Sequence, residues 1–114
     1  MCKVLILLRL EAVSGAVIDV KEFNKEIKKL PNVKDVFLDT LPGTEMKQLM
    51  IAVSENPTDI SDAIKEIEEK GEKIENPKKF NIGEWVAQKT KDIIKEITQE
   101  ETAVIDTAIL ESID

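Results

Sequence analysis

The sequence predicts an α+β domain in which two helices cover one face of an antiparallel sheet. The chain opens with a strongly apolar strand pattern over residues 3–10. Two segments, residues 19–30 and 57–70, repeat apolar residues at the three- and four-residue spacing of an amphipathic helix. Two further strand patterns, residues 33–39 and 47–53, lie between these helices and are separated by a turn. Together these observations indicate one mixed domain.

The first strand is apolar at both parities. Val4, Ile6 and Leu8 alternate with Leu5 and Leu7, whereas a strand with one face in water alternates apolar and polar side chains. Both sides of this strand therefore need a cover.

The first helix follows a loop. Asp19 and Glu22 provide an N-cap and a capping box, and Pro31 stops the helix. The buried stripe of this helix is predicted to comprise Val20, Phe23, Ile27 and Leu30.

The two middle strands, residues 33–39 and 47–53, are adjacent in the sequence and predict a hairpin. Asn56 is the expected N-cap of the second helix, and Gly71 is placed to end it.

A short fourth strand is predicted at residues 72–75. It would lie at the sheet edge, because Pro77 lacks a backbone donor for the ladder. The resulting order β-α-β-β-α-β, with two helices on one face, is typical of the ferredoxin-like sandwich, which we expect over residues 1–80.

Residues 81–114 are predicted to form an appended helical pair. Asn81 caps its first helix, over residues 82–97, and Thr98 caps the second, which runs through Ser112. This C-terminal extension is expected to pack on its own domain or on a partner chain.

Strand parity directs one set of apolar side chains away from the two sandwich helices. This outward set comprises Leu5, Leu7, Phe37, Met50 and Ala52. Soluble monomers rarely leave such a contiguous apolar face in water. Either the C-terminal helices fold across it in the same chain, or two chains stack their sheets, and the sequence favours a homodimer in which the tail takes part. The tail residues expected in this packing are Trp85, Val86, Ile93 and Ile97.

Composition excludes several classes of protein. Sixteen basic residues against 23 acidic ones give a net charge of −7, which disfavours nucleic-acid binding. The chain has no histidine, the usual general base near neutrality and a common metal ligand, so we expect neither a metal nor another cofactor. No apolar run approaches the about 20 residues of a membrane helix, and Cys2 is the single cysteine. A cytoplasmic protein without membrane contact is expected.

Two loops are candidate ligand sites. Ser14 and Gly15 precede the first helix, where backbone amides could receive an anion. Gly43 and Thr44 expose amides in the hairpin turn in the same way. Ordinary turn chemistry also explains both segments, and the two interpretations stay open.

The stretch Ile27-Lys28-Lys29-Leu30-Pro31-Asn32-Val33-Lys34-Asp35-Val36, a helix end followed by a strand, resembles the ferredoxin-like regulatory modules of the ACT and amino-acid-metabolism-regulator type. The resemblance covers residues 4–75. It implies a module that dimerises and binds a small metabolite near the first strand–helix loop, which would implicate Ser14 and Gly15.

The leading hypothesis is a non-catalytic cytosolic interaction or regulatory module that dimerises through its apolar sheet face and its C-terminal helices. The alternative is a small-metabolite sensor of the ACT-like type. A small enzyme is the third possibility, because carboxylates and lysines are present, although the sequence places no pair of them in a recognisable cleft.

Overall fold

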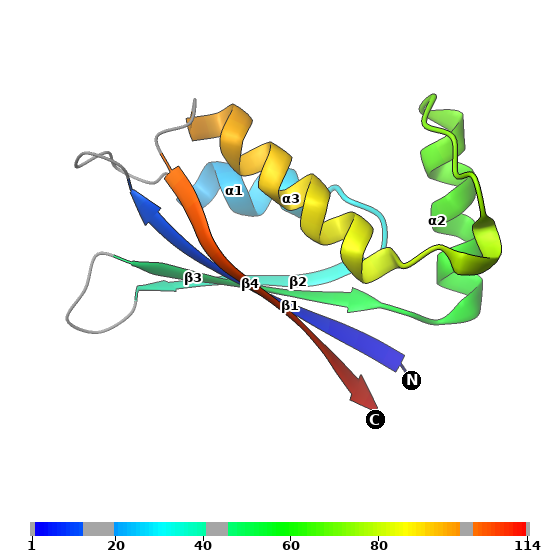
Figure 1. Cartoon of the computed structure of the whole chain (residues 1–114), viewed down its shortest axis with the longest axis horizontal. Helices are drawn as coiled ribbons and strands as arrows, with labels where there is room; N and C mark the ends of the chain where they lie inside the picture. Colours follow the sequence, from blue (N-terminus) through cyan, green and yellow to red (C-terminus); the bar gives the residue numbers. More distant parts are fainter. Residues whose placement is uncertain (1, 13–19, 41–45, 99–101, 114) are drawn as a thin grey trace.

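A computed structural model describes residues 2–12, 20–40, 46–98 and 102–113 of the chain. Within these residues two helices, residues 20–27 and 82–98, lie over one face of a sheet, whereas the predicted second covering helix, residues 57–69, stands beside one end of the sheet (Figure 1). The elements in chain order are β1 (Cys2–Ala12), α1 (Val20–Ile27), β2 (Val33–Thr40), β3 (Lys47–Ser54), α2 (Pro57–Glu69), a short 3-10 helix (Pro77–Lys79), α3 (Ile82–Thr98) and β4 (Thr102–Ile113).

The sheet has four strands in the order β2-β3-β1-β4, and each neighbouring pair is antiparallel. β1 is central and pairs with β3 on one side and with β4 on the other. The register aligns Leu7 with Met50 of β3 and with Ala108 of β4, and it aligns Met50 with Phe37 of β2. The α+β class predicted from the sequence is confirmed.

The core lies between the sheet and the helices, as the strand parities predict. Val4, Ile6 and Leu8 of β1 are at most 2% exposed, and the alternating residues of β3 are buried with them. Phe23 and Ile27 of α1 are fully buried, which confirms the central part of the predicted helical stripe. Burial of each such large apolar side chain contributes about 1.5–3 kcal/mol.

α3 approaches the sheet closely at its first turn. Asn81 caps the helix as predicted, because its Oδ1 accepts the backbone N–H of Glu84 at 3.1 Å. A Cβ at Gly83 would lie 3.1 Å from Cγ1 of Val4 and 3.5 Å from Cγ2 of Ile109. Glycine therefore allows α3 to lie against β1 and β4.

The predicted fourth strand at residues 72–75 is wrong. α2 ends where Gly71 takes a positive φ of 96° and the N–H of Glu72 bonds to the carbonyl of Ile67 at 3.3 Å. Residues 72–75 that follow form an irregular connection.

The second helix of the predicted tail is also wrong, because residues 102–113 form the strand β4. Apolar residues such as Val104, Ile105, Ala108 and Ile109 have helical spacing, but the segment is also rich in β-branched residues. β4 pairs with β1 from Cys2 to Ala12 and satisfies backbone groups that would otherwise remain on an open edge. The C-terminal segment is therefore a strand of the main sheet.

Candidate functional site

The face of the sheet that points away from the helices carries an apolar centre. Cross-strand register places Phe37, Met50, Leu7 and Ala108 in one row across all four strands. The adjacent row contains the apolar residues Ala52, Leu5 and Leu110, and its β2 position is the exposed Asp35, which is paired with Ala52. We call the seven apolar residues of the two rows the open face, because no element of the described chain lies over it (Figure 1).

The two edge strands carry the most exposed large apolar residues of the open face. Phe37 on β2 is 54% exposed, and Leu110 on β4 is 49% exposed. Between them, Leu5, Leu7 and Met50 are each partly exposed. Isolated surface apolar residues are common, whereas soluble monomers rarely expose a large continuous apolar patch.

All five outward residues predicted from the sequence lie on the open face. Ala108 and Leu110 are additional members that sequence reasoning assigned to a helix. The frequent β-branched residues in residues 102–113 were the available signal for a strand.

Charged side chains flank the apolar centre. Arg9 of β1 and Gln48 of β3 are paired in the register, and Gln48 is also paired with Asp39 of β2. Both Arg9 and Asp39 are exposed. A shallow hollow of about 100 Å³ opens on the same face, lined by Leu7, Arg9, Gln48 and Ala108. The open face thus combines a projecting aromatic ring with a nearby hollow.

The tail residues do not lie on the open face, so the alternative in which Trp85, Val86 and Ile93 fold across Phe37 and Met50 of the same chain is wrong. α3 packs on the helical side of the sheet against α1, β1 and β4. Val86 is fully buried there, and Trp85, Ile93 and Ile97 are partly buried against the same core. The reason is that α3 leads into β4, and the core stripe of α3 covers the inward residues of these strands.

The other predicted ligand residues lie outside the described part of the chain. These are Ser14 and Gly15 before α1, and Gly43 and Thr44 between β2 and β3. Among the described residues, no group of three or more His, Cys, Asp or Glu side chains is arranged to hold a metal ion. No helix in the described ranges has the length and apolar character to cross a membrane.

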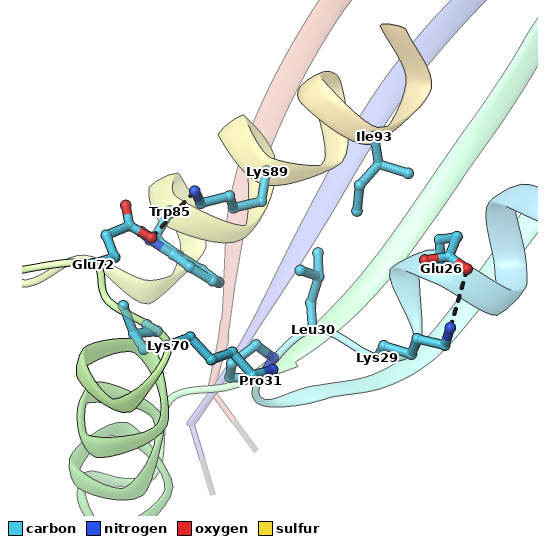
Figure 2. A pocket seen from close by; sticks show the side chains of 10 residues that line it. Glu26, Lys29, Leu30, Pro31, Lys70, Glu72, Trp85, Lys89 and Ile93 are labelled. Carbon is cyan, nitrogen blue, oxygen red and sulfur yellow. Dashed lines mark hydrogen bonds and ion pairs between the residues drawn. The ribbon is translucent and has the colours of Figure 1, made fainter. Parts of the chain in front are cut away.

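A second hollow lies on the helical side of the molecule, between α1, α2 and α3 (Figure 2). The turn after α1 supplies part of its wall. Asn32 in this turn has a positive φ of 67°, which asparagine tolerates better than most residues. The N–H of Ser54 bonds to the carbonyl of Asn32 at 2.9 Å, and Nδ2 of Asn32 bonds to the carbonyl of Ser54 at 3.1 Å. These two bonds fix the turn against the end of β3.

Comparison with known proteins gives no further assignment: no protein-family model matches the chain, and a search of curated proteins finds no match. We therefore argue the function from the described geometry.

Proposed function

We propose that this protein is a non-catalytic interaction or regulatory module that forms a homodimer by stacking the open faces of two sheets. The observation that carries this proposal is the exposed apolar row from Phe37 to Ala108, together with Leu110 in the adjacent row. Apolar surface removed from water contributes about 25 cal/mol per Å², and stacking two such faces removes it on both chains.

The strand order supports the interpretation of the fold as a ferredoxin-like sandwich. In the sheet, β3 lies between β1 and β2, and β1 lies between β3 and β4. The connection from β3 to β4 contains both α2 and α3, so one helix is added to the simple β-α-β-β-α-β order. Helices gathered on one face leave the other face available for a partner.

The outer surface of the sheet, of which the open face is the apolar centre, has a size that suits a second copy of the chain. Eight residues at about 3.3 Å rise, across four strands about 4.8 Å apart, give this whole surface about 26 by 19 Å. This is about 500 Å² in projection, so two stacked faces bury about 1,000 Å², the lower limit expected for a specific interface. The corrugation of the side chains adds to this area.

The row from Phe37 to Ala108 is also self-complementary. A two-fold axis parallel to the strands, passing between β3 and β1, would lay β2 of each copy over β4 of the other. Phe37 would then lie over Ala108 of the second copy, beside the hollow that Ala108 helps to line. A large side chain would thus face a small one in this row. In the adjacent row, Leu110 would lie over Asp35 of the second copy.

The same axis favours an ionic contact at the edge of the apolar centre. Arg9 of one copy would lie over Gln48 of the other, beside Asp39 in the same row. The register also pairs Arg9 with Asp106 of β4, so the same axis lays Asp39 of each copy over the Asp106 position of the other. This row therefore brings like charges as well as opposite charges together, and charge pairs contribute more to register and orientation than to affinity.

Light scattering on the full chain over a concentration series tests the proposal. We expect a dimer mass for the wild type and a monomer mass for the double variant Phe37→Ser/Leu110→Ser, which removes the two most exposed apolar side chains of the face. Lys65→Ser, an exposed substitution on α2, is the control and should remain dimeric. A wild-type chain that is monomeric throughout, or a double variant that is still dimeric, would contradict the stacking of open faces.

A further inference from the structure

The hollow among the helices has an apolar floor. It has a volume of about 360 Å³, within the range of small-molecule sites, which begins at about 300 Å³. The floor and walls are formed by Leu30, Pro31, Ile67, Trp85 and Ile93. These side chains come from three separate parts of the chain, namely the turn after α1, the end of α2 and the length of α3 (Figure 2).

Three lysines stand around this floor, each from a different part of the chain. Lys29 follows α1, Lys70 follows α2 and Lys89 belongs to α3. Among the described residues that line the hollow, these three ammonium groups accompany two carboxylates, Glu26 and Glu72. The lining thus has one more ammonium than carboxylate, and the carboxylate that pairs with Lys70, that of Glu66, lies outside the lining.

The ion pairs of these lysines are weak enough to rearrange. Nζ of Lys29 lies 3.1 Å from Oε1 of Glu26, and Nζ of Lys89 lies 3.2 Å from Oε2 of Glu72. The side chain of Lys29 is 61% exposed and that of Lys89 is 36% exposed. Lys70 pairs with Glu66 at 3.2 Å and is 69% exposed. Solvent-exposed pairs of this kind contribute at most about 1 kcal/mol, so a ligand anion can compete for the ammonium groups.

We propose that this hollow binds a small organic anion with an apolar body, such as an aromatic or acyl carboxylate. The apolar part would lie on the floor, and the anionic group would reach the lysines at the rim. The proposal is independent of dimerisation, because the hollow lies on the helical side and the open face lies on the other side of the sheet (Figure 1).

The environment of Trp85 favours an anion over a cation. The ammonium of Lys89 lies 5.4 Å from the centre of the indole ring, within the range of a cation–π contact. A cationic ligand would have to displace this ammonium and would meet two further lysines.

The test uses 8-anilinonaphthalene-1-sulfonate, an aromatic anion, and its uncharged analogue N-phenyl-1-naphthylamine. Trp85 is the single tryptophan of the chain, so quenching of its fluorescence reports binding near the hollow. We expect saturable quenching by the sulfonate and about fivefold weaker binding of the uncharged analogue, the factor that corresponds to about 1 kcal/mol for a contact between exposed charges.

Matched variants locate the binding site on the full-length protein. Lys70→Gln/Lys89→Gln should weaken sulfonate binding about fivefold, whereas Lys65→Gln on the outer surface of α2 should leave it unchanged. Energy transfer from Trp85 could also report probe that is bound on the open face. Phe37→Ser/Leu110→Ser, which removes the most exposed apolar side chains of that face, is therefore a second control and should leave sulfonate binding unchanged. Three results would each overturn the proposal. They are equal binding of the two probes, unchanged sulfonate binding in the lysine double variant, and loss of sulfonate binding in the open-face variant.

Discussion

Replacing Phe37 by alanine is expected to weaken the proposed homodimer while leaving the monomer folded. An aromatic side chain presents about 200 Å² to solvent when free, and 54% exposure leaves about 110 Å² of Phe37 accessible in the single chain. At about 25 cal/mol per Å², complete burial of this area would contribute about 2.7 kcal/mol per copy, or about 5 kcal/mol per symmetric dimer.

The expected loss is smaller than this upper value, because alanine still buries its own methyl group and the ring of Phe37 sits on an edge strand. If half of the area is desolvated, Phe37→Ala costs about 2.7 kcal/mol per dimer, which corresponds to roughly a 100-fold increase in the dimer Kd. The folded monomer should lose only the cross-strand contact between Phe37 and Met50, about 0.2–1 kcal/mol.

Sedimentation equilibrium over a dilution series measures the dimer Kd, and circular dichroism melting at a concentration where the variant is monomeric measures the fold. Ile74→Ala provides the control for removal of a partly exposed apolar side chain away from the sheet. A Kd for Phe37→Ala within twofold of the wild-type value would refute the reasoning. A Kd that rises equally in Ile74→Ala would refute the assignment of the interface to the open face.

Three further predictions concern the fold that presents these surfaces. Phe23→Ala, which empties a fully buried site in α1, should lower the free energy of unfolding by about 3–5 kcal/mol in urea titration; a loss below 1 kcal/mol would contradict the described core. Gly83→Ala should cost about 1–3 kcal/mol despite its better helix propensity, because its Cβ meets Cγ1 of Val4 at 3.1 Å, and adding Val4→Ala should reduce this increment in a double-mutant cycle. Truncation after Thr98 removes β4 and leaves β1 with an open edge, so we expect aggregation and loss of the cooperative thermal transition; a soluble fragment with wild-type Tm would show that β4 is dispensable.

Several features of the fold could be predicted from local sequence patterns. The period-two alternation of Val4, Ile6 and Leu8 with Leu5 and Leu7 assigned each side chain to the correct face of the sheet. Helical spacing located Phe23 and Ile27 in the core, and Asn81 was recognised as the cap of α3 from its own hydrogen-bonding chemistry. Such features depend on a few neighbouring residues, whose spacing and polarity are visible in the sequence.

The open face could be predicted in part. Its centre, including Phe37 and Met50, followed from strand parity, whereas Ala108 and Leu110 were missed because residues 102–113 were assigned to a helix. Apolar residues such as Val104 and Ile109 fit both periods, so local spacing left the choice open.

What the sequence by itself determined about this protein was its α+β class, the parity of the first three strands and the apolar character of the face opposite the helices. Tertiary structure alone decided that residues 102–113 are a strand and that α3 covers the same side as α1. The physical reason is that both depend on partners far away in the chain. The unpaired backbone groups along β1 select β4 as a strand, and the close approach at Gly83 seats α3 on β1 and β4.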